Sequence, residues 1–498
     1  MIKKIFFILG ICCVCGFIYF NTRETDNFTL NLIHTNDLHS HILPFDDYHD
    51  CPLDSDCLGG FARIITFLNQ EKSPDTLILD AGDRFTGTAF YTLSKSKPLL
   101  PLFKKMPYDA ITLGNHEFDD NLSETISFLK QWHVPVVVSN LKVPLNNELH
   151  TLIKSTTIIK KMNHKIGIIG LLTPETVILD NPDLTIQNLS EVVAKEISSF
   201  KKQGVHIIIV LSHIGLRADK KLAKDFPEID IIIGGHSHSL LSNDTTISSV
   251  AGPYPISLNQ GKTLIVSTGM GGRFIGKLQV TFNPAGEILK YQGNTIPVNA
   301  KIMNDPSATK IIQKAQQEIK SILIKPITTL KTPIGFTAER NYCSEDCPIG
   351  LYLTQTLHTA YPSVDGVLLN SGSIRRGLPS GLISYHNLIE TYPFDDEAVL
   401  IQLTGEELKE YLEHGIAHYS SKGKTNAMLQ TAGVKYHFSK ERKKITEITV
   451  KGMPIDAKKR YTFLVSAYLA NGGDGYPIKT YQKTGHTICE ILKTQMKK

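Results

Sequence analysis

The chain has 498 residues, of which 41% are hydrophobic and 20% are charged, and its formal net charge at pH 7 is +5. This length predicts two or three domains at about 150 residues each. The composition excludes both a multi-span membrane protein and a disordered one. Because the net charge is small and no basic stripe is interleaved with aromatic residues, we expect no nucleic-acid partner.

The N-terminal segment predicts export. Lys3 and Lys4 precede an uninterrupted apolar run from Ile5 to Phe20, and a polar stretch begins at Asn21. A charged start followed by such a run is typical of a secretory signal or of an uncleaved anchor. No Ala-x-Ala cleavage site follows the run. We therefore expect residues 1–25 to direct the protein to the periplasm or the cell exterior, either cleaved or retained as a membrane tether.

Cysteine usage agrees with export. Cys51 with Cys57, and Cys343 with Cys347, each close a short polar loop. In an oxidising compartment such pairs predict local disulfides. The alternative is a metal site, but the four cysteines lack the CxxC spacing of zinc ribbons. Cys489 is left over, and we expect it to be a buried free thiol.

Residues 26–303 alternate apolar strand candidates with amphipathic stretches. Continuous apolar runs bounded by polar loops indicate strands that are buried on both faces. The pattern predicts a layered α/β domain with mixed sheets. The predicted strands cover 30–34, 76–81, 110–113, 134–138, 165–171, 205–211, 229–233 and 264–268, and the predicted helices include 61–69 and 189–202.

The second half of the chain begins with a connecting helix. Apolar residues recur at helical spacing over 307–323, after Asp305-Pro306, which is a good helix start. Residues 304–325 are therefore predicted to link the first domain to a smaller α/β domain over 326–498. Its predicted strands cover 366–369, 398–403 and 461–465, and its predicted helices cover 349–359 and 405–413.

Five predicted strands of the first domain end in side chains that bind metals. In open α/β sheets, ligands bind at the carboxyl ends of strands. One such residue alone would more often be a cap or a turn residue, but five strand ends of this kind predict a metal site. The ligand candidates are Asp37, His39, Asp83, Asn115, His213, His236 and His238.

Seven candidates exceed the four ligands that one zinc ion takes, so we expect two divalent ions (Zn, Mn, Co or similar) that share Asp83. Such a pair generates hydroxide near neutral pH and clamps the oxygens of a displacement at phosphorus. His116 has no ion in this scheme. It is free to stabilise the developing charge or to protonate the leaving oxygen, and Asp119 is placed to orient it.

These motifs resemble those of the calcineurin-like metallophosphatases. The motif Gly59-Gly60-x-Ala62-Arg63 and the pair Phe118-Asp119 narrow the resemblance to the 5'-nucleotidase branch, and it extends from about Thr29 to the end of the chain. The resemblance implies one ion held by Asp37, His39, Asp83 and His238, and a second held by Asp83, Asn115, His213 and His236. It also implies that the second domain rotates against the first to carry substrate to the metals.

The second domain carries candidate substrate residues. The segment from Asn370 to Arg375 offers an amide and a guanidinium suited to phosphate. Phe394 and Tyr468 either stack a base between them or simply anchor their loops. The resemblance favours stacking. It implies that the substrate is contacted by Asn370, Gly372, Arg375, Phe394, Tyr468, Asp474 and Arg340.

The resemblance implies a metal-dependent enzyme that hydrolyses nucleoside 5'-monophosphates with a metal-bridging hydroxide. Arg340 is the one cation where the family has an arginine-rich segment, which disfavours long polyphosphates. Rival substrates on the same site are UDP-sugars, dinucleotides, 2',3'-cyclic nucleotides and sulfur esters. A rival of another class is a catalytically inactive nucleotide-binding surface protein, although its site would be expected to have lost at least one ligand. The oligomeric state is left open.

Overall fold

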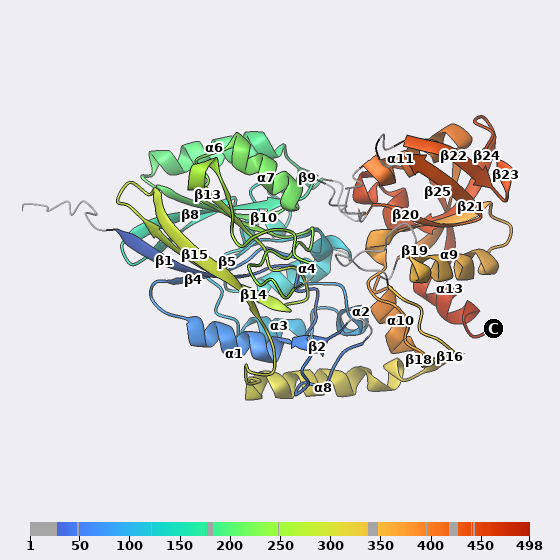
Figure 1. Ribbon diagram of the computed structural model, residues 1–498, viewed down its shortest axis with the longest axis horizontal. Coiled ribbons are helices and arrows are strands. Elements are labelled where there is room, and N and C mark those ends of the chain that lie inside the picture. The colour runs from blue at the N-terminus through green and yellow to red at the C-terminus, as the bar shows by residue number, and fades with distance from the viewer. Residues whose placement is uncertain are drawn as a thin grey trace, which may run out of the picture.

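The computed structural model describes residues 27–498 apart from 47–48, 121, 175, 177–182, 248, 337–346, 395, 418–426, 440 and 442–443. It shows two mixed α/β bodies side by side, with a long helix along the lower edge that reaches from one toward the other (Figure 1). Among the described residues, no helix is both long and apolar enough to cross a membrane. The expected export segment lies outside this range.

Two sheets form the N-terminal domain, as the mixed-sheet prediction requires. The first has the order β15 (Ile288–Pro297), β14 (Phe274–Phe282), β1 (Phe28–Thr35), β4 (Thr76–Asp80), β5 (Ala110–Ile111). The second has the order β12 (Ile256–Leu258), β13 (Thr263–Val266), β11 (Ile231–Gly234), β10 (Ile207–His213), β8 (His164–Leu172), β7 (Thr156–Lys161). Small two-stranded ribbons pair β2 (Pro44–Phe45) with β3 (Leu58–Gly59), and β6 (Leu141–Lys142) with β9 (Thr185–Ile186).

The side chains of the first sheet alternate between two apolar cores because successive strand residues point to opposite faces. Leu32 and Leu77 pack in the core shared with the second sheet. Ile33 and Ile78, one position later in each strand, pack against the helices on the other face. Both faces are therefore covered, which explains why these strands are apolar throughout.

Helices cover the sheets and join the domains. The N-terminal helices are α1 (Phe61–Glu71), α2 (Ala89–Ser94), α3 (Leu99–Phe103), α4 (Leu122–Lys130), α5 (Leu149–Leu152), α6 (Leu189–Lys202) and α7 (Leu216–Asp225). The predicted connecting helix is α8 (Pro306–Leu323), which packs against α1, α2 and α3. Asp305 caps it by accepting the backbone N–H of Ala308 at 2.7 Å, and Pro306 occupies its first turn, where no N–H is needed.

A five-stranded mixed sheet forms the centre of the C-terminal domain. Its order is β20 (Leu429–Ala432), β17 (Gly366–Asn370), β24 (Arg460–Ser466), β19 (Glu397–Thr404), β25 (Tyr481–Thr487). Smaller sheets pair β16 (Pro326–Leu330) with β18 (Gly381–Ser384), and β21 (Val434–Ser439) with β22 (Lys444–Val450) and β23 (Met453–Pro454). The helices are α9 (Pro348–Ala360), α10 (Tyr385–Thr391), α11 (Gly405–Ala417), α12 (Ala467–Ala470) and α13 (Ile488–Gln495). Helix α10 contacts both α2 and α8, and so joins the two domains.

Some sequence-based expectations need correction or fall outside the described residues. The strand predicted over 134–138 is wrong, because these residues form only isolated bridges, Val136 with Ile111 and Val137 with Lys154. The Cys51–Cys57 disulfide is present, and Cys489 is a buried thiol that donates to the Tyr392 carbonyl oxygen at 3.2 Å. Cys343 and Arg340 lie outside the described residues.

Candidate metal and nucleotide site

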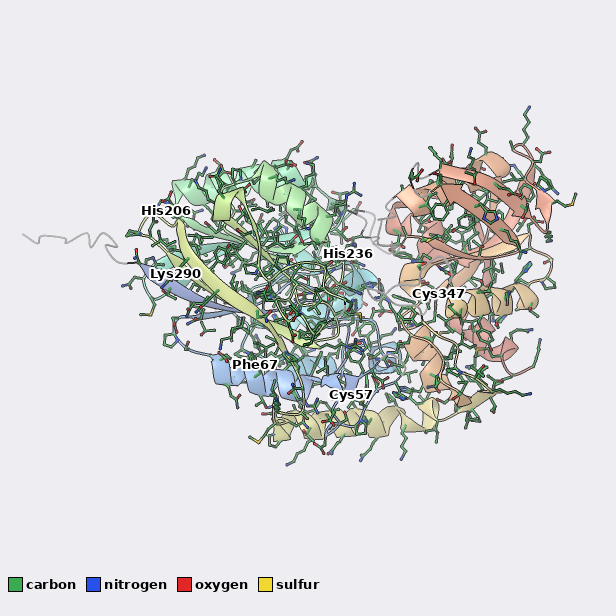
Figure 2. The ribbon with its side chains drawn as sticks, viewed as in Figure 1. Cys57, Phe67, His206, His236, Lys290 and Cys347 are labelled. Carbon is green, nitrogen blue, oxygen red and sulfur yellow. A yellow bond between two sulfur atoms is a disulfide. The ribbon has the colours of Figure 1, made fainter. Side chains whose placement is uncertain are left out.

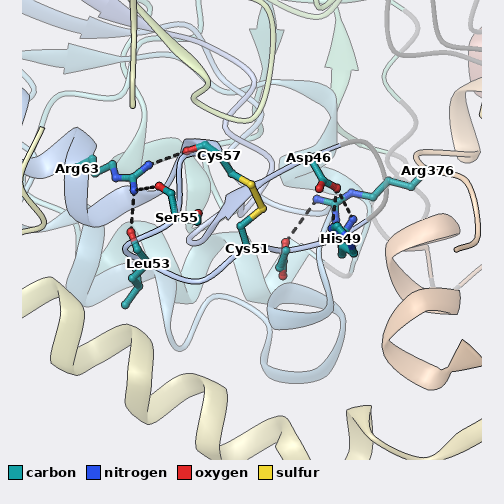
Figure 3. Close-up of a disulfide and its surroundings, with 9 residues drawn as sticks. Asp46, His49, Cys51, Leu53, Ser55, Cys57, Arg63 and Arg376 are labelled. Carbon is teal, nitrogen blue, oxygen red and sulfur yellow. Dashed lines mark hydrogen bonds and ion pairs between the residues drawn. A yellow bond between two sulfur atoms is a disulfide. The ribbon is translucent and has the colours of Figure 1, made fainter. Parts of the chain in front are cut away.

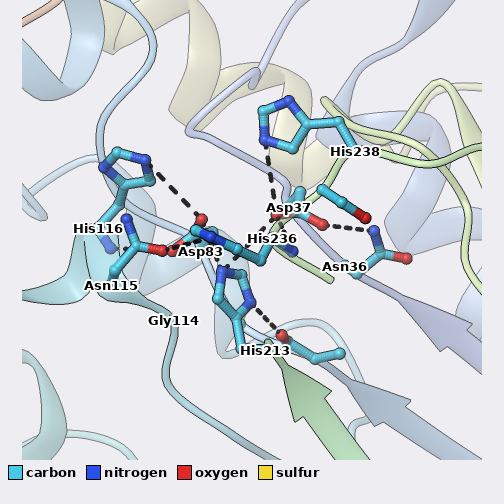
Figure 4. Close-up of polar contacts among 12 residues, drawn as sticks. Asn36, Asp37, Asp83, Gly114, Asn115, His116, His213, His236 and His238 are labelled. Atoms are coloured by element: carbon cyan, nitrogen blue, oxygen red, sulfur yellow. Dashed lines mark hydrogen bonds and ion pairs between the residues drawn. The ribbon is translucent and has the colours of Figure 1, made fainter. Parts of the chain in front are cut away.

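The strand ends of both N-terminal sheets meet at one place. Two groups of ligand atoms form there, each within 4.8 Å of one another, and they have Asp83 in common (Figure 4). The first group is Asp37, His39, Asp83 and His238, and the second is Asp83, His213 and His236. Asn115 joins the second group, since its Oδ1 lies 2.9 Å from His236 Nδ1. The structure thus brings together all seven predicted ligand candidates.

The spacing of the donor atoms is that of a cation site. His39 Nε2 lies 2.9 Å from His238 Nε2 and 3.7 Å from Asp83 Oδ2. His213 Nε2 lies 2.9 Å from the same Asp83 oxygen, and His238 Nε2 lies 3.6 Å from Asp37 Oδ1. All five side chains are at most 4% exposed, so water cannot compensate their charges and lone pairs.

The orientation of two imidazole rings turns the Nε2 atoms toward the ligand cluster. His213 Nδ1 lies 2.7 Å from the Ala81 carbonyl oxygen, and His39 Nδ1 lies 3.3 Å from that of Thr86. A carbonyl only accepts, so each Nδ1 carries a proton, and Nε2 is the nitrogen that faces the cluster and would bind a cation there. Two buried Nε2 atoms 2.9 Å apart, those of His39 and His238, would be stabilised by a cation between them, and mixed N and O ligands suit divalent transition metals.

The pKa shifts follow the same electrostatics. Burial by itself lowers the pKa of His213, but the carboxylate of Asp83 outweighs it and raises that pKa to about 10. Burial also opposes ionisation of Asp83, yet the imidazoles of His213 and His116 hold its pKa well below the usual range. For Asp37, burial dominates and raises the pKa to about 7. The ionised carboxylate of Asp83 therefore stabilises positive charge on the groups around it.

The backbone at the site is strained. The φ angle is positive at Asp37 (50°), His39 (45°), Asp83 (57°), His236 (70°) and His238 (48°). Side chains other than glycine rarely adopt this left-handed conformation, which costs about 1–3 kcal/mol where the surrounding structure enforces it. Five of the seven ligand candidates thus sit on strained turns, as is typical of functional sites.

Glu117, which had no role in the sequence-based scheme, holds these turns together. Its carboxylate accepts backbone N–H groups from Asp83 (3.1 Å), Arg84 (2.6 Å) and Gly114 (2.6 Å). Gly114 must be glycine, because a Cβ there would lie 2.1 Å from Asp83 Oδ1. Arg84 is also missing from the scheme, and it pairs with Asp80 at 2.6 Å. In the sequence, the only indication of these roles is that Glu117 and Arg84 are charged residues next to the ligand motifs.

His116 lies beside the ligands without joining either group. Its Nδ1 is 2.5 Å from Asp119 Oδ2, and its Nε2 is 4.0 Å from Asp83 Oδ2. Burial lowers the pKa of His116, but the charges of Asp119 and Asp83 outweigh burial and raise it. A protonated imidazole beside the cluster can donate a proton or stabilise negative charge.

A cavity between the domains extends from this cluster to the C-terminal domain. His236 lies on the side of the N-terminal domain that faces the other domain (Figure 2). The substrate candidates are brought to the same cavity, with Arg340 outside the described residues. The lining includes Asn115, His116, Asp119, His236, His238, Asn370, Gly372, Arg375, Phe394, Tyr468 and Asp474.

Hydrogen bonds order the C-terminal wall of the cavity. Asn370 Nδ2 donates to Asp474 Oδ2 at 2.8 Å, and the Tyr468 hydroxyl donates to Asp474 Oδ1 at 3.2 Å. Arg375 reaches across the cavity, where its Nη2 lies 3.2 Å from His116 Nε2 and its guanidinium lies over the Phe394 ring. The wall therefore presents two aromatic rings, the carboxylate of Asp474 and the guanidinium of Arg375 to the cavity.

Comparisons with known proteins agree with this geometry. Residues 30–240 match the family model of calcineurin-like phosphoesterases, and residues 326–481 match that of the 5'-nucleotidase C-terminal domain. An apyrase from Aedes aegypti is 30% identical over 96% of this chain and 92% of its own length. The 5'-nucleotidase of Homo sapiens is 29% identical over 90% of this chain and 84% of its own. The crystal structure of a 5'-nucleotidase precursor from Thermus thermophilus matches with a TM-score of 0.84 and 29% identity, covering 94% of this chain and 96% of that chain.

Proposed function

Because this chain belongs to the family of 5'-nucleotidases and apyrases, we propose that it hydrolyses nucleoside 5'-monophosphates to nucleoside and phosphate. The chain is a hydrolase with a metallophosphoesterase domain, and that domain implies the use of divalent metal. One cavity carries this proposal, because it is lined by His116 and by part of the ligand cluster on one side and by Phe394 and Tyr468 on the other. Because the ring centroids of Phe394 and His116 lie 5.7 Å apart, we expect a base stacked on Phe394 to have its phosphate near the cluster.

Charges along the cavity support a monophosphate. Among the described lining residues, the only cationic side chains other than histidine are Lys95 and Arg375. Lys95 is already paired with Asp120, at 2.9 Å. The described lining also carries further carboxylates, Asp119, Asp396 and Asp474. Compared with a monophosphate, a di- or triphosphate brings one or two additional negative charges, for which this wall offers little compensation.

The ligand set fits two divalent ions that share Asp83. When bound, such ions lower the pKa of water to near neutrality and neutralise phosphoryl oxygens. His116, held by Asp119, stabilises the charge that develops on phosphorus-bound oxygen or protonates the leaving 5'-oxygen. Arg375, 3.2 Å from His116, binds the phosphate with a planar pair of N–H donors. Phe394, Tyr468 and Asp474 hold the nucleoside, and Asn370 orients the carboxylate of Asp474.

A substrate panel with each candidate metal tests the function. AMP, UDP-glucose, NAD, a 2',3'-cyclic nucleotide and an aryl phosphate are compared by kcat/KM, and AMP is expected to rank first. A higher value for any of the others assigns the site to that substrate instead. Chelation and the Asp83→Asn substitution are both expected to abolish turnover, and full activity after either would exclude a metal-dependent reaction. Metal analysis should return two ions per chain.

We also propose that the protein is exported. Support comes from the charged and apolar N-terminal segment and from the Cys51–Cys57 disulfide, since disulfides persist in oxidising compartments. One relative is a snake venom 5'-nucleotidase. Cell fractionation tests the location, and N-terminal sequencing of the mature protein separates a cleaved signal from a retained tether.

A further inference from the structure

Arg376, the neighbour of the substrate candidate Arg375, is buried at the interface between the domains. It is 3% exposed. Within its own domain its Nη1 lies 3.0 Å from Glu390 Oε2. Across the interface its Nη2 lies 3.5 Å from Asp50 Oδ1 and 3.3 Å from His41 Nδ1. One guanidinium thus contacts three polar side chains from both domains, and we call Arg376, Glu390, Asp50 and His41 the interdomain latch.

Glu390 extends the latch to the cavity wall. Its Oε1 accepts the backbone N–H of Ala89, the first residue of α2, at 2.8 Å. Three residues later in α2, the Thr92 hydroxyl donates to the Pro393 carbonyl at 2.9 Å. Thr92 and Pro393 both line the cavity, and Pro393 precedes the aromatic Phe394. The latch therefore touches the segments that present the nucleoside side of the site.

The N-terminal partner Asp50 is held by a small braced loop. It directly precedes Cys51, which is disulfide-bonded to Cys57 (Figure 3). Inside the loop, the guanidinium of Arg63 donates to the carbonyl oxygens of Cys57 (2.7 Å), Leu53 (2.8 Å) and Ser55 (2.6 Å). Arg63 is itself 1% exposed. The disulfide and these three hydrogen bonds leave the loop little freedom to move Asp50 away.

The other N-terminal partner, His41, lies two residues after the metal-ligand candidate His39. Its ring stacks on Phe45 with a centroid distance of 3.9 Å, and the guanidinium of Arg376 lies 4.9 Å from the same Phe45 ring. Because arginine only donates, His41 Nδ1 accepts its hydrogen bond. Arg376 thus contacts the turn that carries a metal ligand, while its neighbour Arg375 reaches His116.

Buried ion pairs contribute little net stability, since desolvation offsets their attraction, but losing one partner is costly and their geometry fixes register. A planar guanidinium with several fixed donors suits this role better than a lysine. We propose that Arg376 is a positioning residue that holds the C-terminal domain in the register in which Arg375 and Phe394 reach the metal cluster. The activity readout rests on the proposed nucleotidase function.

The test compares Arg376→Met, Arg376→Lys and Asp50→Asn in the full chain. Arg273→Met is the matched control, because Arg273 stacks on the same Phe45 ring at 4.5 Å from within the N-terminal domain. Three quantities are measured: kcat/KM for AMP, metal content, and interdomain distance by energy transfer. The dyes are attached to cysteines introduced at Leu145 and Met453, which are 86% and 69% exposed in separate domains.

Arg376→Met should lower kcat/KM at least tenfold and shift or broaden the interdomain distance, with metal content as in the wild type. Arg376→Lys should recover part of both losses, and Arg273→Met should change neither. An unchanged distance in both Arg376→Met and Asp50→Asn overturns the proposal. The proposal is also overturned if the activity falls only in variants that have lost bound metal or have a lower Tm. If the wild type hydrolyses no nucleotide, the proposed function is wrong. The distance measurement still tests whether Arg376 positions the C-terminal domain.

Discussion

The carboxylate of Glu117 accepts the backbone N–H of Asp83 at 3.1 Å, so the residue that both ligand groups share is fixed by the neighbour of His116. Glu117 is 3% exposed and binds two further backbone N–H groups within 2.6 Å. Groups that orient metal ligands contribute to affinity without touching the ion. A residue to which the sequence-based scheme assigned no role thus shapes the centre of the site.

Glu117→Gln should weaken metal binding by about 10- to 100-fold, because one amide group replaces an oxygen acceptor facing several N–H donors. Metal titration of the chelated protein measures the affinity. Glu196→Gln is the control, since Glu196 is also buried but belongs to α6, outside the ligand groups. Equal metal affinity in Glu117→Gln and the wild type would contradict the assigned role.

Asp119→Asn should lower kcat by about tenfold or more and move the alkaline limb of the pH profile to lower pH. The sign follows from the charge of Asp119, which raises the pKa of His116. Without that charge, the protonated imidazole is lost at a lower pH. Asp120→Asn is the control because Asp120 pairs with Lys95. A limb that stays in place would show that His116 does not act in its protonated form.

Phe394→Ala should raise KM for AMP by about 5- to 150-fold, from about 1–3 kcal/mol per stacked base. The KM for an aryl phosphate, which has no base, should stay within about twofold. Tyr468→Ala is expected to behave in the same way, with an added effect through its hydrogen bond to Asp474. Equal losses with both substrates would show that the rings only anchor their loops.

His34 should make the fold sensitive to acid. Its Nε2 lies 2.8 Å from the Tyr254 hydroxyl, and burial lowers the pKa of His34 to about 3. An unfolded histidine titrates near 6.5, so the contribution of His34 is complete above that pH. As pH falls from about 6.5 toward 3, protonation of His34 in the unfolded chain lowers the free energy of unfolding by up to about 1.4 kcal/mol per pH unit.

Between pH 7 and pH 5, the Tm of His34→Gln should therefore fall by less than the Tm of the wild type. Both proteins are measured after chelation, so that metal release does not contribute. His437→Gln, at an exposed position, should follow the wild-type slope. If His34→Gln follows it as well, another group causes the acid sensitivity.

Sequence patterns predicted what depends on local periodicity. The predicted helices over 189–202 and 307–323 match α6 and α8 almost residue for residue. The strand ends could be grouped because buried parallel strands share an edge, and all seven ligand candidates meet there. Residues 134–138 show the limit, since an apolar run also forms where the chain only passes beside a sheet.

Contacts across domains could not be predicted in this way. Arg376 reads as an ordinary surface arginine beside Arg375 until Asp50, more than 300 residues earlier, is brought against it. Glu390 and Ala89 are related in the same manner. Neither periodicity nor motif spacing predicts how two folded domains pack against each other. The interdomain latch forms only when they do.

The left-handed turns under the ligands bear on how such a site evolves. Aspartate, asparagine and histidine adopt this conformation more readily than β-branched residues do, so backbone geometry and metal chemistry select the same residue types at Asp37, His39, Asp83, His236 and His238. A descendant that abandons the metals would still need residues that tolerate these turns. Glycine or asparagine at those positions would therefore indicate a paralogue that has lost the metals but kept the turns. Valine or isoleucine would indicate that the backbone conformation of the turns had changed.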